Sequence, residues 1–133
     1  MTGREFELAE ILTFIRDEGI QNVAFISSDV HYGAVYFYNP DVALYKEFNP
    51  FYEFIAGPMH AGSFGPTFMA DPTFGPMLQF QYAGRLLGYD ANAPPLIGHV
   101  LGYLEVSEEG VLDAQLLDSD GRILYRKFLT PEE

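Results

Sequence analysis

The residues with the clearest chemical potential are an acid and an imidazole two positions apart, Asp29 and His31. They follow residues 23–26, a continuous apolar run that is typical of a strand buried on both faces. In open α/β sheets, ligands bind beyond the carboxyl ends of the strands. A carboxylate and an imidazole together suit zinc, iron or manganese, and the carboxylate alone also suits calcium or magnesium. We therefore expect Asp29 and His31 to be metal ligands that serve one ion or bridge two.

The same triplet also has a plainer interpretation, because an Asp-x-His sequence is short enough to arise by chance. In that interpretation Asp29 hydrogen-bonds the backbone of a turn and His31 is partly exposed. His60 is a second candidate, for substrate binding, because the small residues around it would let the backbone approach a ligand closely. Its alternative is a hydrogen-bonded loop histidine. His99 lies far along the chain from Asp29, and we expect it to be structural.

Other polar residues suggest less chemistry. Glu53 lies inside an aromatic run, so its carboxylate needs a partner that the sequence does not identify. Tyr36 and Tyr38 share a strand face by period two, which favours packing. The chain contains no cysteine, which excludes disulfides and thiolate metal sites. It also contains no nucleotide-binding loop and no Gly-x-Ser-x-Gly motif. Four acidic residues are expected in solvated turns, namely Glu108, Glu109, Asp118 and Asp120.

Composition and charge limit the size of the domain and the kinds of molecule that the chain can bind. The 133 residues fit one domain or one piece of a larger domain, and 48% of them are hydrophobic, which is enough to build a core. The formal net charge of −12 argues against a nucleic-acid platform and against docking on anionic membranes. An acidic protein that handles a phosphate ester needs a bound cation to reverse the local field. No apolar run reaches the roughly 18 residues of a membrane span.

The elements that must position Asp29 and His31 can be read from local patterns. Thr2 to Glu5 has the form of a capping box, and it precedes a helical stripe that ends near Gly19. The stripe consists of Leu8, Ile11, Leu12 and Ile15. Strands are predicted at residues 23–26, 34–38 and 51–55. Alternation then predicts an antiparallel meander at residues 100–106, 111–117 and 123–128.

Residues 54–84 form an unusual apolar segment. The segment carries one formal charge, Asp71, and three Gly-Pro pairs, which should prevent long regular elements. Long structureless loops are rare in compact domains, and solvated loops are normally polar. We therefore expect this irregular segment to be covered by protein outside the chain, or to drive self-association of the chain.

Taken in order, these pieces resemble the C-terminal portion of the alkaline phosphatase D (PhoD-like) metallophosphoesterases. Residues 25–32 are similar to the family signature Thr-Gly/Ala-Asp-Val-His-Tyr. Residues 3–12 resemble the helix that precedes this signature, and residues 98–129 resemble the closing strands. Between them, residues 49–66 and 71–76 match a long family block that includes Gly57-Pro58-Met59-His60-Ala61-Gly62.

This resemblance implies an α/β fold, the C-terminal part of a metallophosphoesterase sandwich, with residues 1–133 as one partial domain. It implies metal-assisted hydrolysis of phosphomonoesters or phosphodiesters at a multinuclear site, reported with iron and calcium in some members. Asp29 would be a metal ligand. His31 would lie at the metal or the phosphate, with a catalytic role in assisting the leaving group or holding a phosphate oxygen. Family members are often exported, although the sequence itself does not fix a compartment.

Two departures from the family pattern matter. Ser27-Ser28 replaces Thr-Gly/Ala, and Tyr52 replaces a common tryptophan. The earlier family motifs, which supply most of the metal ligands, have no counterpart in this sequence. We therefore expect the missing N-terminal half to act as a partner, in cis or in trans, and the isolated chain to be inactive. The alternative is a non-catalytic remnant or interaction module that uses residues 54–84 as a partner surface.

Overall fold

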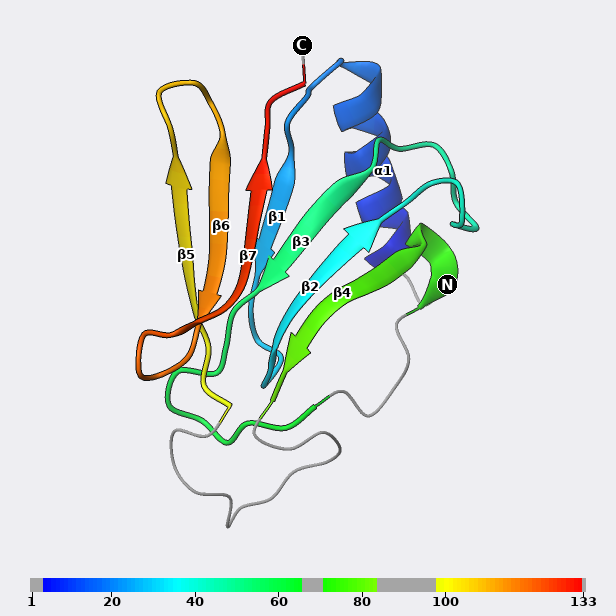
Figure 1. Ribbon diagram of the computed structural model, residues 1–133. Helices are drawn as coiled ribbons and strands as arrows, with labels where there is room; N and C mark the ends of the chain where they lie inside the picture. The colour runs from blue at the N-terminus through cyan, green and yellow to red at the C-terminus, as the bar shows by residue number, and fades with distance from the viewer. Residues whose placement is uncertain (1–3, 66–70, 84–97, 133) are drawn as a thin grey trace.

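The computed structural model describes residues 4–65, 71–83 and 98–132, which form three layers (Figure 1). Helix α1 (Arg4–Asp17) packs on one face of a four-stranded mixed sheet. A three-stranded antiparallel sheet lies against the opposite face. The expected α/β class, with one N-terminal helix, a mixed sheet and a C-terminal meander, is confirmed.

The order of the four-stranded sheet places two loops at one end of the molecule. Its strands are β1 (Ala24–Ser27), β3 (Phe51–Ile55), β2 (Gly33–Tyr38) and β4 (Pro76–Tyr82), in that spatial order. β1 and β3 are parallel, whereas β2 is antiparallel to both of its neighbours. Because parallel strands end at the same side of a sheet, the loops that follow β1 and β3 leave from that side together.

The strand β4 differs from the expectation of an irregular segment. Pro76 is its first residue, and β4 lies at the edge of the sheet, where a missing N–H costs little pairing. It follows a short 3-10 helix, η1 (Pro72–Phe74), which ends at Gly75. Phe54, Ile55 and Phe74 are buried within the chain, so its own residues cover them. Residues 66–70 and 84 of this segment lie outside the described residues.

Two apolar clusters hold the layers together. One cluster lies between α1 and the four-stranded sheet and consists of Leu12, Ala43, Phe48, Phe51 and Phe74. The other joins the two sheets and consists of Val35, Phe54, Val100, Ala114 and Leu116. Alternation along β3 explains this division, because side chains at odd and even positions leave a strand on opposite faces.

Helix α1 ends as predicted, but it buries less of its surface than its sequence suggests. Gly19 has φ +64° and follows the last turn, which confirms it as the stop signal. Leu12 is 2% exposed, whereas Ile11, predicted on the same stripe, is 52% exposed. Leu8 and Ala9 complete the contact with the sheet, so Ile11 falls outside it. The predicted cap, Thr2, lies outside the described residues.

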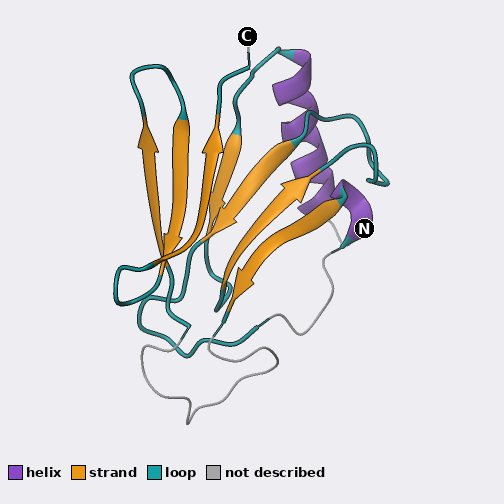
Figure 2. Cartoon of the chain, in the orientation of Figure 1, coloured by secondary structure: helices purple, strands orange, loops and turns teal. Residues whose placement is uncertain are grey.

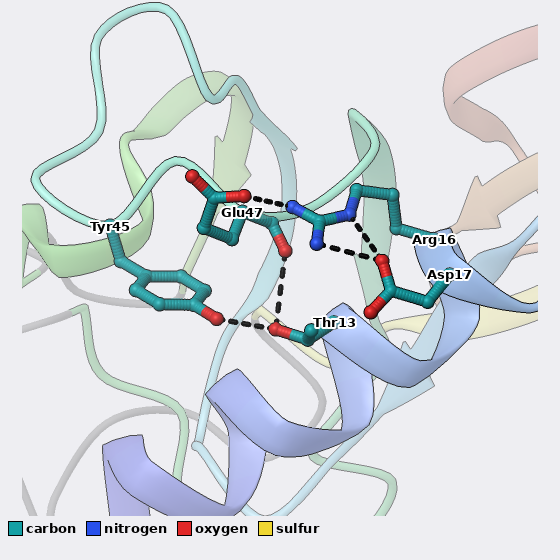
Figure 3. A network of polar contacts seen from close by, with 5 residues as sticks. All are labelled: Thr13, Arg16, Asp17, Tyr45 and Glu47. Carbon is teal, nitrogen blue, oxygen red and sulfur yellow. Dashed lines mark hydrogen bonds and ion pairs between the residues drawn. The ribbon is translucent and has the colours of Figure 1, made fainter.

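Polar contacts fasten α1 to the segment that follows β2 (Figure 3). Thr13 donates a hydrogen bond to the carbonyl oxygen of Glu47 at 3.3 Å and shares another with the Tyr45 hydroxyl. Arg16 forms ion pairs with Asp17 and Glu47. These contacts fix one end of the helix over the sheet, although exposed ion pairs of this kind contribute only about 0–1 kcal/mol each.

The expectation that residues 23–26 are buried on both faces is wrong for β1. Ile26 is 66% exposed, and Phe25 is half-buried. β1 lies at the edge of the four-stranded sheet, which leaves one side of the strand open among the residues described. The continuous apolar run correctly predicts a strand. How deeply that strand is buried depends on its position in the sheet.

The C-terminal strands lie within one residue of their predicted bounds. They are β5 (Leu101–Val106), β6 (Leu112–Leu117) and β7 (Ile123–Leu129), paired as a meander (Figure 2). β6 is central and buries Ala114 and Leu116 against the other sheet. Among the described residues, no helix has the length and apolar character needed to cross a bilayer.

The contact of Gly75 with the loop after β2 generates a testable prediction. Gly75 has φ +59°, and a Cβ there would lie 2.5 Å from the carbonyl oxygen of Asn39. Gly121 has φ +78° with no atom near its Cβ position, which makes it a matched control. Gly121→Ala should lower the free energy of unfolding by about 1 kcal/mol, because alanine adopts the left-handed conformation less readily than glycine. Gly75→Ala should lower it by at least about 2 kcal/mol in urea titrations, because a clash is added. Equal losses would contradict the packing described.

Candidate functional site

The loop between β1 and β2 carries both predicted metal ligands. Asp29 is exposed and has φ +76°, a left-handed conformation that aspartate tolerates better than most residues. The carbonyl oxygen of Ser27, at the end of β1, accepts a hydrogen bond from Ala56 N at 3.2 Å. The loop therefore begins at a backbone position that is fixed to the end of β3.

His31 is held by the loop that follows β3. Its Nδ1–H donates a hydrogen bond to the carbonyl oxygen of Gly62 at 2.6 Å. Its ring centroid lies 4.8 Å from that of Phe64, and its own carbonyl accepts a hydrogen bond from Phe64 N at 2.9 Å. Because a carbonyl can only accept, Nδ1 carries the proton and Nε2 keeps a lone pair. This is the arrangement by which proteins orient a metal-binding imidazole.

The segment from Gly57 to Ser63 is fastened in turn to residues just before β5. Val100 N donates to the carbonyl of Pro58 at 3.3 Å, and Ser63 Oγ donates to the carbonyl of Gly98 at 3.0 Å. His99 Nε2–H donates to the carbonyl of Ala61 at 2.9 Å. His99 is buried, in keeping with the structural role expected for it.

His60 lies in the same segment, and its side chain is exposed. It is two residues from Gly62, whose carbonyl holds His31. The structure thus places all three sequence candidates, Asp29, His31 and His60, on two loops at the same end of the four-stranded sheet. The role of His60 in binding a substrate stays a prediction.

Glu53 supplies a polar tie across the sheet beside this loop. Ser27 Oγ donates to one carboxylate oxygen at 2.6 Å, and Tyr38 Oη donates to the other at 2.7 Å. Burial, and then the charge of Glu53, raises the pKa of Tyr38. Burial and the nearby Tyr32 raise the pKa of Tyr36 to about 12. The phenols therefore stay neutral, and Tyr38 remains a donor that ties β2 to β3.

Asp29 and His31 carry donor groups of the types that bind metal ions. Asp29 offers an exposed carboxylate, and His31 offers an oriented imidazole with a free nitrogen. Within residues 4–65, 71–83 and 98–132 there is no group of three or more acidic, histidine or cysteine side chains that could hold an ion. Two ligands leave most positions around a cation to other donors.

Sequence reasoning named Asp29 and His31 as candidate ligands, and it missed the groups that hold the loop around them. The carbonyl of Gly62 has no signal in the sequence, because every residue carries a carbonyl. Glu53 accepts hydrogen bonds from Ser27 and Tyr38, which lie on two different strands. These three residues meet because of the register between β1, β3 and β2. The sequence indicated only that the Glu53 carboxylate, inside an aromatic run, would need hydrogen-bond donors.

Comparison with known proteins yields one match. The family model described as PhoD-like phosphatase matches residues 1–106, which include Asp29, His31 and the segment from Gly57 to Ser63. No curated protein matches the chain. No solved structure matches it either.

The left-handed conformation of Asp29 predicts how stability responds to its replacement. Asp29→Gly should leave the free energy of unfolding within about 0.5 kcal/mol of the original or raise it, because glycine relieves the backbone strain. Asp29→Ala should lower it by about 1 kcal/mol, because alanine adopts this conformation less readily than aspartate. Urea titrations of both variants provide the measurement. A loss above about 1 kcal/mol in Asp29→Gly would show that the carboxylate stabilises the fold instead of being free to bind a ligand.

Proposed function

Because the chain belongs to the PhoD-like phosphatase family, we propose that Asp29 and His31 form one arm of the metal centre of a phosphoester hydrolase. The observation that carries this proposal is the hydrogen bond from His31 Nδ1 to the carbonyl of Gly62. It leaves Nε2 as the free nitrogen of an imidazole that is already oriented. The family is generally metal-dependent, which agrees with this donor set.

The two side chains have distinct tasks in this proposal. Asp29 binds a cation through its carboxylate, and His31 Nε2 binds either a cation or a phosphate oxygen. A bound di- or trivalent ion, with iron and calcium suggested by the family resemblance, would supply positive charge for the phosphate and activate water. The carbonyl of Gly62 keeps the imidazole of His31 from turning away. His60, whose side chain is exposed on the neighbouring loop, would contact the substrate.

The substrate class follows from charge. The chain carries a formal net charge of −12, so its overall field repels a phosphate ester unless a cation reverses the field locally. A small phosphomonoester or phosphodiester fits such a site better than a nucleic acid, which would need a basic surface.

The remaining ligands would come from the family's earlier motifs, on a segment in cis or a partner in trans. The edge of β1, which no strand of the described residues pairs with, is the place where such a segment would join the sheet. This edge has no charge, no proline and an exposed Ile26, so it lacks the features that normally block strand pairing. A strand added parallel to β1 would end beside Asp29 and deliver its own ligands there.

A second candidate function is a non-catalytic interaction module. The supporting observation is exposed apolar surface on two elements. This surface consists of Phe6, Ile11 and Phe14 on α1, and Leu101, Tyr103, Leu104 and Val106 on β5. In residues 54–65 and 71–83, by contrast, the exposed large apolar side chains are those of Met59, Met77 and Leu78. Surface of this kind marks a partner site or self-association of the chain.

Hydrolysis assays test the proposed function. The isolated chain, given iron, calcium, manganese or zinc ions and bis(p-nitrophenyl) phosphate, should show negligible turnover, because two ligands cannot complete the centre. Combined with a polypeptide that carries the earlier family motifs, it should hydrolyse the substrate in a metal-dependent manner. Asp29→Asn and His31→Ala should each then reduce the rate by on the order of 100-fold or more. Asp120→Asn, an exposed acidic turn residue, is the matched control and should leave the rate unchanged.

Two results would contradict the proposal. Robust hydrolysis by the isolated chain would show that the centre is complete within it. Full activity of the combined polypeptides with both Asp29 and His31 replaced would remove these residues from the centre. A stable complex that never gains activity would favour the interaction module.

A further inference from the structure

Two consecutive peptide carbonyls each accept a hydrogen bond from a histidine. The carbonyl of Gly62 accepts from His31 Nδ1 at 2.6 Å, and the carbonyl of Ala61 accepts from His99 Nε2 at 2.9 Å. The two imidazoles come from different parts of the fold, because His31 precedes β2 in one sheet and His99 precedes β5 in the other. The 61–62 segment therefore links them directly.

The environment of His99 is poorly suited to a residue kept only for packing. The residue is 9% exposed, and its Nδ1 is buried with no hydrogen-bond partner among the described residues. A buried acceptor left unsatisfied destabilises the folded state. An apolar side chain of similar size would avoid that cost. What the imidazole supplies that an apolar side chain cannot is the N–H that reaches Ala61.

The position of this N–H in the segment is also specific. Val100 N holds the carbonyl of Pro58, and Ser63 Oγ contacts the carbonyl of Gly98. These two contacts fasten the ends of the segment, whereas His99 fastens the peptide next to Gly62. Glycine has the widest backbone freedom, so the direction of the Gly62 carbonyl depends on how its neighbouring peptide is held.

We infer that His99 is a positioning residue that orients His31 through the carbonyls of Ala61 and Gly62. Fixing the Ala61 carbonyl fixes the plane of the 61–62 peptide on one side of Gly62. This narrows the directions open to the Gly62 carbonyl, which accepts from His31 Nδ1. The inference that His99 orients His31 is drawn from the hydrogen bonds alone. Its effect on metal binding by His31 rests on the proposed function. His99 thereby couples the start of the second sheet to the ligand loop of the first.

Nitrogen-15 NMR of the imidazoles at a fixed, neutral pH tests this inference. In the unmodified chain, His31 should be the Nδ1–H tautomer, since the Gly62 carbonyl accepts that proton. His99→Leu should convert His31 to a mixture of tautomers while the chain stays folded. His99→Asn, whose side chain is shorter, should do the same. His99→Gln, which keeps a longer N–H donor, should restore the Nδ1–H form in part.

A zinc titration followed at His31 Nε2 gives the second readout. His99→Leu should weaken zinc binding there about 10–100-fold, as loss of an orienting group does at metal-binding histidines. Leu116→Ala is the control for a purely structural effect. It should lower the urea midpoint of unfolding, because Leu116 is buried, and leave the tautomer of His31 unchanged.

The outcomes separate this inference from the proposed function. An unchanged His31 tautomer in folded His99→Leu and His99→Asn would overturn the positioning role. The same change of tautomer in Leu116→Ala would also overturn it, because the effect would then be general. A changed tautomer in a chain that does not bind zinc at His31 would support the positioning role and count against the proposed metal site.

Discussion

The hydrogen bond from His31 Nδ1 to the carbonyl of Gly62 is the constraint on which the candidate site depends. It joins two loops that are far apart in sequence, and it decides which imidazole nitrogen is free. The parallel pairing of β1 and β3 makes it possible, because both strands end at the same side of the sheet. The Ala56–Ser27 backbone contact and the Glu53 tie then fix the distance between the two loops.

The rest of the fold covers the four-stranded sheet on both faces. Helix α1 and the cluster around Leu12 cover one face, whereas Val100 and the central strand β6 cover the other through the second cluster. β1 is the exception, because its outer edge is unpaired among the described residues. In the proposed function, this uncharged edge beside Asp29 is where a further strand would join the sheet.

Local patterns predicted every strand except β4 to within one residue, because side-chain alternation and turn residues are encoded locally. They failed where the outcome depends on the position of a strand in the sheet. β4 begins at Pro76, which a sheet edge tolerates, and Ile26 of the apolar β1 is exposed on a strand that also lies at an edge. In the same way, Asp29 and His31 were recognisable as a motif, whereas the contacts of Gly62 and His99 arise only when the two sheets meet.

Paramagnetic broadening by manganese tests the central claim, that Asp29 and His31 bind a cation, most directly. In two-dimensional NMR spectra of the full chain, substoichiometric Mn²⁺ should first broaden the amide signals of residues 28–32 and 60–63. The exposed acidic turns near Glu108 and Asp120 provide an internal comparison, since a chain of net charge −12 attracts cations at many places. Broadening that starts at those turns and spares residues 28–32 would contradict the account.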